Sequence, residues 1–195
     1  MDDFPVPQQI RAVVVTAIEE AQRRGSAAVA PEHLLLALAS EADSIAAGIL
    51  ADVGLDHEAL DRALDTERAR SLAVVGIDEL DASLLNATPR SMTRPGWAST
   101  TREVFRRAQP PGRGRHRRAE LDVLYGVITA NVGTVARALE YAGVDRDGLI
   151  GRVERERLAD LGNAPLTAHQ GQSAQERQAL RREAVKRAQQ ARRER

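Results

Sequence analysis

Cysteine is absent from this chain of 195 residues, which excludes disulfide bonds, thiolate metal sites and cysteine nucleophiles. A sequence without cysteine suits a reducing compartment, and we expect a cytoplasmic protein. Aromatic side chains are also scarce, at 3% of the residues. A core with so few aromatic rings must be built from Ala, Leu, Val and Ile, and this composition favours closely packed helices over a β-sandwich.

Lysine is nearly missing, because Lys186 is the only one. Residues 1–185 therefore contain no lysine that could form a Schiff base or hold a phosphate group. Long apolar runs are lacking too, and none approaches the roughly 20 residues that a membrane-spanning helix needs. The acidic N-terminus has no apolar segment of the signal-peptide kind. We expect neither a membrane span nor secretion by that route.

The sequence contains none of the common catalytic motifs. It has no glycine-rich loop ending in Gly-Lys-Ser or Gly-Lys-Thr for nucleotide phosphates and no Gly-x-Ser-x-Gly nucleophile turn. The four histidines are far apart in sequence and form no pair with metal-ligand spacing. We therefore expect no enzyme activity, no cofactor and no metal ion.

Helical periodicity is present in several segments instead. Residues 8–24 repeat apolar side chains at the spacing of an amphipathic helix that ends at Gly25. A second helix is expected to open at Pro31, a third to end at Gly54, and a fourth to begin after Asp56, a favourable N-cap. No segment alternates polar and apolar side chains in the manner of a strand. The predicted class is all-α.

The apolar pattern occurs twice, at an offset of 89 residues. Leu35 corresponds to Leu124, Leu50 corresponds to Leu139, and the Gly-Leu-Asp turn at 54–56 corresponds to Gly-Val-Asp at 143–145. We predict repeat one at 6–68, a linker at 69–96 and repeat two at 97–157, within one domain of residues 1–160. A repeat of about 65 residues is small for a core of its own. The two repeats should therefore form one eight-helix bundle, which should also cover Leu72, Val75, Leu84 and Leu85.

Positive charge is concentrated in two places, although the formal net charge is zero. Residues 161–195 are predicted to be a flexible basic tail. The second place is the segment 106–118, where the arginines suited to phosphate or acidic-partner contacts are Arg113, Arg115, Arg117 and Arg118. A solvated basic loop is the interpretation we favour for this segment, and nucleic-acid binding through it would be electrostatic.

Four segments together resemble a known family. They are Ile10–Val15, Glu19–Ala21, the block Pro-Glu-His-Leu-Leu-Leu-Ala-Leu at 31–38, and Ala51–Asp56. They are similar to the first repeat of the Clp N-terminal domain, which precedes the AAA+ rings of Clp unfoldases of the ClpC and ClpA kind. The resemblance covers roughly residues 6–157 and includes the double repeat. It implies two pseudo-symmetric four-helix halves, here standing alone without AAA+ modules.

The resemblance implies a non-catalytic module that captures protein or peptide ligands in Clp-linked proteolysis or its regulation. Its partners would be Clp substrates, adaptors or a Clp unfoldase, with phosphoarginine as a possible ligand. Glu32 and His33 match the family's ligand-binding block, although Pro31 stands where threonine is usual. The second repeat has Leu121 and Asp122 at these positions. The alternative is a nucleic-acid-associated regulator that uses the arginine-rich loop and the tail.

Overall fold

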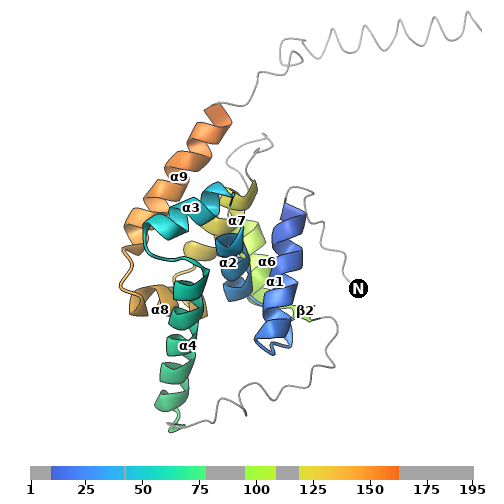
Figure 1. Cartoon of the computed structure of the whole chain (residues 1–195), viewed down its shortest axis with the longest axis vertical. Helices are drawn as coiled ribbons and strands as arrows, with labels where there is room; N and C mark the ends of the chain where they lie inside the picture. The colour runs from blue at the N-terminus through green and yellow to red at the C-terminus, as the bar shows by residue number, and fades with distance from the viewer. Residues whose placement is uncertain (1–9, 42, 78–94, 109–118, 163–195) are drawn as a thin grey trace, which may run out of the picture. The chain divides into compact units, whose positions relative to one another are not determined.

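The computed structural model describes residues 10–41, 43–77, 95–108 and 119–162, which contain eight helices and two short strands (Figure 1). The first four helices are α1 (Arg11–Arg23), α2 (Pro31–Ser40), α3 (Ile45–Asp52) and α4 (His57–Val74). The others are α6 (Ser99–Arg107), α7 (Ala119–Ile128), α8 (Thr134–Tyr141) and α9 (Arg146–Gly162). The all-α fold predicted from the sequence is confirmed.

The helices form two similar sets of four. Helices α3 and α8 are both eight residues long, and their first residues, Ile45 and Thr134, are 89 positions apart. Helices α4 and α9 also begin 89 positions apart, at His57 and Arg146. The sequence offset therefore corresponds to a structural repeat.

Local sequence sets the ends of the helices. The Asp56 carboxylate accepts a hydrogen bond from the backbone N–H of Ala59 at 2.8 Å and caps α4, as predicted. Ser44 caps α3 in the same way, with 3.0 Å between its hydroxyl oxygen and the N–H of Ala47. Gly54 follows α3 with a φ of +75°, a left-handed conformation that side chains with a Cβ rarely adopt.

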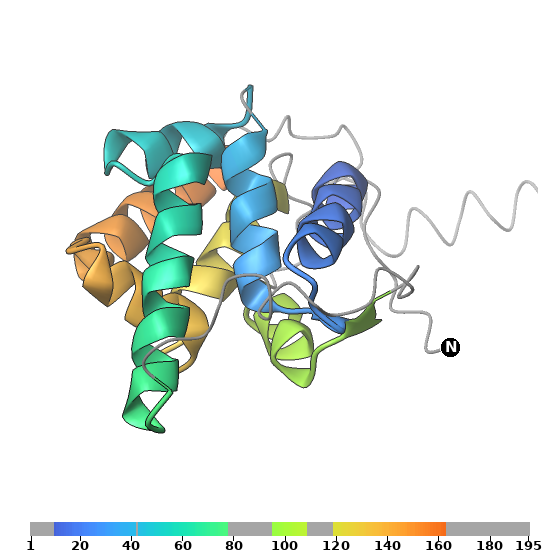
Figure 2. The same ribbon diagram turned by 60° about the horizontal axis from the view of Figure 1, so that its bottom comes forward.

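Two helices are at the centre of the fold, α2 in repeat one and α7 in repeat two (Figure 2). Six consecutive residues of α2, 33–38, are buried, and α7 is buried on most of its surface. A helix that is apolar on nearly all sides must be covered on all sides. Helix α1 covers α2, α6 covers α7, and the two central helices also contact each other.

The outer helices pack across the two repeats. Helix α4 of repeat one lies against α8 of repeat two, and α9 of repeat two lies against α3 of repeat one. An ion pair joins each of these contacts: Glu67 with Arg137, and Asp52 with Arg152. One cluster of buried apolar residues contains members of both repeats. The predicted shared core is therefore present.

A pair of two-residue strands also joins the repeats. Strand β1 (Ala28–Val29) pairs in parallel with β2 (Gly96–Trp97). The fully buried hydroxyl of Thr101, in α6, donates a hydrogen bond of 2.7 Å to the carbonyl of Val29. This contact fixes the beginning of repeat two beside the segment that leads into α2.

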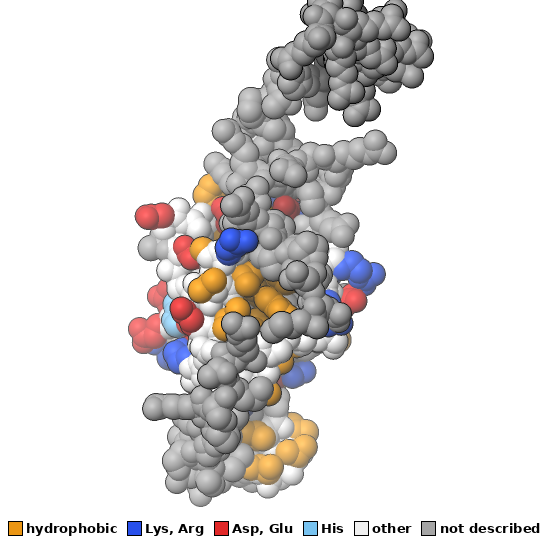
Figure 3. All heavy atoms as spheres, turned by 90° about the vertical axis from the view of Figure 1, so that its right-hand side faces the viewer, with side chains coloured by type: hydrophobic (Ala, Val, Ile, Leu, Met, Phe, Trp, Pro, Cys, Tyr) orange, Lys and Arg blue, Asp and Glu red, His pale blue; other side chains and the backbone are white. Residues whose placement is uncertain are grey.

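The prediction that the packed repeats cover Val75 is wrong. Helix α4 continues to Val74, six residues into the segment predicted as linker, and carries the chain away from the core. Val74 and Val75 are 86% and 69% exposed, and Figure 3 shows apolar side chains at the end of the molecule where α4 ends. Leu72 is partly covered, while Leu84 and Leu85 lie outside the described residues. The first compact unit ends at Gly162, where α9 also ends, so the helix includes the first two residues of the predicted tail. The rest of that tail, 163–195, lies outside the described residues.

Candidate ligand-binding site

The beginning of α2 contains the two residues that sequence reasoning selected for ligand binding. Ala30 precedes the helix with φ −109° and ψ 168°, an extended backbone that suits the N-cap position. Pro31 occupies the first helical position, where its fixed φ is favourable and its missing N–H costs no helical hydrogen bond. Glu32 and His33 therefore occupy the second and third positions of the helix.

His33 is a structural residue in this arrangement. Its side chain is buried, and Nδ1 accepts a hydrogen bond of 2.9 Å from the backbone N–H of Ala30. An acceptor on Nδ1 places the ring proton on Nε2. Burial lowers the pKa of His33 to about 4, and the positive charge of Arg24 acts in the same direction. The neutral ring thus replaces the Glu or Gln of a capping box, whose side chain at the third helical position accepts a hydrogen bond from the backbone N–H of the N-cap residue.

Three of the four backbone positions that lack a helical partner at the start of α2 can be accounted for. The N–H of Ala30 is bound by His33, and Pro31 has no N–H. The N–H of His33 donates to the carbonyl of Ala30 at 3.0 Å. Among the described residues, these three positions therefore offer no backbone donor to a ligand.

The Glu32 carboxyl group is partly covered and lies in a mixed electrostatic field. Burial raises the pKa of Glu32, and the negative charge of Glu67 adds to this effect. The bond from its own N–H and the charge of Arg24 oppose it. The result is a carboxyl group with a raised pKa at the edge of the helix start.

The positive charge of Arg24 is already shared. Its guanidinium forms ion pairs with Asp61 and Asp65 of α4, the second at 2.7 Å, and its side chain is only 13% exposed. Arg23 also binds Asp61, at 2.8 Å, and donates to Glu20. These contacts hold the end of α1 against α4, and both terminal nitrogens of the Arg24 guanidinium donate to carboxylates of α4.

Glu67, the acidic group that acts on Glu32, is buried. Its Oε1 accepts from the Arg137 side chain at 2.7 Å and from the Ser71 hydroxyl at 2.7 Å. A buried carboxylate needs such partners, because an unpaired charge in the core is costly. Sequence reasoning missed this pair, since Glu67 and Arg137 belong to helices that are far apart in the chain.

The corresponding positions of repeat two have a different role. Leu121 replaces Glu32 and is fully buried, while Asp122 replaces His33. Asp122 accepts a hydrogen bond of 2.8 Å from Arg157, and both side chains are almost completely buried. The Arg157 guanidinium also lies 4.1 Å from the ring centre of Tyr125. This repeat uses the position to fix α9 on α7.

The arginine-rich loop can be followed only at its beginning, because Arg113, Arg115, Arg117 and Arg118 lie outside the described residues. Arg106 pairs with Glu103 on the same helix. Arg107 donates to the carbonyl of Gly126 at 2.9 Å and so connects α6 to α7. Of the charged segment 106–118, these two arginines make contacts inside the domain.

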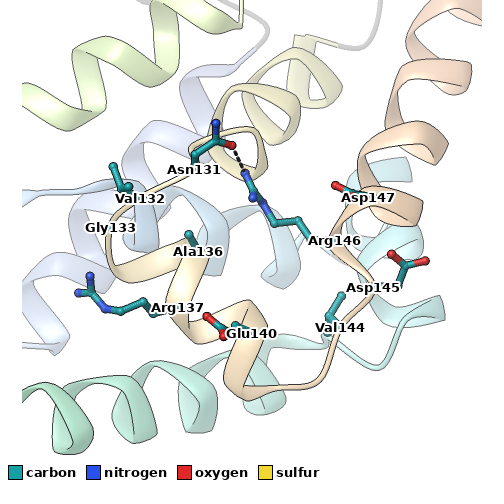
Figure 4. A pocket seen from close by; sticks show the side chains of 10 residues that line it. All are labelled: Asn131, Val132, Gly133, Ala136, Arg137, Glu140, Val144, Asp145, Arg146 and Asp147. Atoms are coloured by element: carbon teal, nitrogen blue, oxygen red, sulfur yellow. Dashed lines mark hydrogen bonds between the residues drawn. The ribbon is translucent and has the colours of Figure 1, made fainter.

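An open hollow of about 620 Å³ lies between the connections on either side of α8 (Figure 4). The Arg146 side chain crosses it and donates to the carbonyls of Ile128 and Ala130, both at 2.8 Å, and to the Asn131 side chain. A cation at this place satisfies the last carbonyl of α7 and a second carbonyl just beyond the end of that helix. The hollow therefore contains a helix cap, and sequence reasoning gave no indication of it.

A comparison with family models identifies the first part of the chain. Residues 7–94 match the model of the Clp repeat (R) N-terminal domain. Over this segment the chain is similar to the Clp repeat N-terminal domain family. The match includes α1 to α4 and the Glu32 block, and the resemblance noted in the sequence is confirmed. No curated protein matches the chain.

Clp repeat domains bind proteins or adaptors and do not themselves carry out catalysis. Within the described residues, no group of histidine and acidic side chains is arranged to hold a metal ion. In the same part of the chain, no single helix is both long and apolar enough to cross a bilayer. Helices α2 and α3 are long and apolar enough only when they are taken together, and the chain bends by 96° between them.

Proposed function

We propose that this protein is a non-catalytic binding module that captures protein or peptide ligands in Clp-linked proteolysis or its regulation. The family match over residues 7–94 carries the proposal, because Clp repeat domains bind substrates and adaptors. Glu32 is the proposed contact residue. Its carboxylate is partly accessible at the edge of α2, whereas His33 is committed to the helix cap.

The partly accessible carboxylate of Glu32 supports a contact with a positively charged group of the ligand. An arginine side chain presents two parallel N–H donors that match the two oxygens of a carboxylate. Glu67 increases the negative charge of the surroundings without competing for the ligand, because Arg137 and Ser71 occupy its Oε1.

The test measures binding of the full chain to fluorescein-labelled casein, an unfolded protein, by fluorescence anisotropy. Glu32→Gln should weaken binding several-fold. The matched control is Glu58→Gln, which changes an exposed carboxylate of α4 that pairs only with Arg62 of the same helix among the described residues. A labelled random DNA duplex in the same assay examines the alternative function. Failure to bind casein together with salt-sensitive binding of the duplex would refute the proposal.

A further inference from the structure

The hollow beside α8 is lined by apolar residues that differ from their counterparts in repeat one. Val144 lines it and is partly exposed, whereas Leu55, 89 positions earlier, is only 1% exposed. Val132 also lines the hollow and is 84% exposed, although repeat one has the charged residue Asp43 at the corresponding position. An exposed valine gains free energy when a partner covers it. Repeat two therefore has an apolar contact point that repeat one lacks at these positions.

The charges of the lining leave two carboxylates available to a ligand (Figure 4). Both lining guanidinium groups are bound by the protein itself, Arg137 by Glu67 and Arg146 by the carbonyls at the end of α7. The side chains of Glu140 and Asp147 are exposed, and neither forms a hydrogen bond or an ion pair with the part of the chain that the structure describes. The charge that the hollow offers to a ligand is therefore negative.

We propose that this hollow is a docking site for a segment of a partner protein in which two basic side chains flank an apolar one. The basic side chains pair with Glu140 and Asp147, and the apolar side chain covers Val132. The volume of about 620 Å³ is in the range of ligand-binding clefts in proteins. A bare cation would pair with the carboxylates but leave Val132 in water, so the lining favours a segment that carries both kinds of side chain.

This inference goes beyond the proposed function, because Glu32 is not among the residues that line the hollow. The two sites also differ in the ligand that each requires. The contact at Glu32 is with one guanidinium group, whereas the hollow presents two carboxylates and an apolar surface. A peptide with a single basic residue would leave one of these carboxylates without a partner.

The experiment measures binding of three fluorescein-labelled peptides to the full chain by anisotropy at fixed salt. The peptides share Ser-Gly at one end and Gly-Ser at the other, and their centres are Lys-Leu-Lys, Gln-Leu-Gln and Lys-Ser-Lys. The Lys-Leu-Lys peptide should bind about tenfold more tightly than Gln-Leu-Gln and about fivefold more tightly than Lys-Ser-Lys. Lysine is used because the contact proposed at Glu32 depends on the paired donors of arginine.

Variants of the hollow and matched controls locate the binding. Glu140→Gln and Asp147→Asn should each weaken binding of the Lys-Leu-Lys peptide about two- to fivefold, as expected for one exposed ion pair. Glu19→Gln changes an exposed carboxylate of α1 outside the hollow and should have no effect. Val132→Ser should weaken binding about fivefold, whereas Val74→Ser, which changes a valine that is 86% exposed at the end of α4, should leave binding unchanged.

Failure of the Lys-Leu-Lys peptide to bind, or equal binding of the Gln-Leu-Gln peptide, would overturn the inference. Equal losses in Glu140→Gln and Glu19→Gln would do the same. Spermine is added as a competitor to examine a site for bare cations. If spermine displaces the peptide and Val132→Ser changes nothing, the hollow binds cations alone and the inference is wrong. Capture of casein that depends on Glu32 would in each case leave the proposed function standing.

Discussion

Acidification should destabilise the domain through His33. The ring is neutral in the fold, with a pKa near 4, whereas an unfolded histidine has a pKa near 6.5. Because the folded pKa is the lower one, the unfolded state binds the proton first as the pH falls. The stability from the neutral ring is complete above about pH 6.5 and is lost progressively as the pH falls towards 4.

The two pKa values set the size of the effect. Between pH 7 and pH 5, protonation of His33 in the unfolded state should remove about 2 kcal/mol of the free energy of unfolding. The domain also has many carboxyl groups, and their titration must be separated from that of the histidine. His33→Gln provides the separation, because glutamine at the third helical position can accept from the N-cap N–H and does not titrate.

The measurement is urea unfolding of the wild type and His33→Gln at pH 7 and pH 5, followed by circular dichroism. The stability difference between the two pH values should be about 2 kcal/mol smaller in the variant. Identical pH dependence in the two proteins would refute the assignment of a buried, neutral capping role to His33. A variant that loses most of its helical signal at pH 7 would show that glutamine cannot replace the cap, and the comparison would then use His33→Asn.

Three further outcomes follow from the same structure. Gly126→Ala should lower the free energy of unfolding by about 1–3 kcal/mol, measured by thermal or urea unfolding, because the new Cβ would meet a backbone carbonyl of α6. Gly48→Ala, in an open part of α3, should raise the free energy of unfolding by about 0.5–1 kcal/mol. A double-mutant cycle on Glu67 and Arg137 should give a coupling energy of about 1–3 kcal/mol, and a value near zero would contradict the role of this pair between the repeats. Binding of a labelled peptide with a central arginine, followed by anisotropy over a pH series, should weaken on acidification at a pH above the ordinary carboxyl value. The reason is that the pKa of Glu32 is raised and the neutral acid cannot pair with a guanidinium.

The helices could be predicted because their signals are local. Apolar periodicity, the Asp56 cap and the glycine turns act within a few residues of each helix, and the structure contains each of them. The offset of 89 residues identified the repeat for the same reason, since matching local signals recur in matching order. The family match covers the repeat in which these signals are clearest.

The contacts between the repeats could not be predicted. Glu67 and Arg137 are 70 positions apart, and nothing in either helix indicates that the outer helices pack on the opposite repeat. The exposure of Val75 was missed because an apolar residue near a linker gives no information on the direction in which its helix leaves the core.

At the candidate site, the sequence assigned the same ligand-binding role to Glu32 and His33, and the structure shows that their surroundings differ. Glu32 and His33 are adjacent, yet one is partly exposed and the other is buried in a cap. The capping role could have been anticipated, because an acceptor side chain at the third helical position is the known partner of the N-cap N–H.

Backbone amide chemical shifts, recorded while a short peptide with a central arginine is titrated into ¹⁵N-labelled full-length protein, test the proposed contact at Glu32 most directly. The account predicts that the largest changes occur at the beginning of α2 and at the adjoining end of α1, around Glu32 and Arg24. The same titration with Glu32→Gln should leave those signals nearly unchanged. Large changes confined to residues 131–147, around the hollow beside α8, would place the ligand in repeat two and contradict the account.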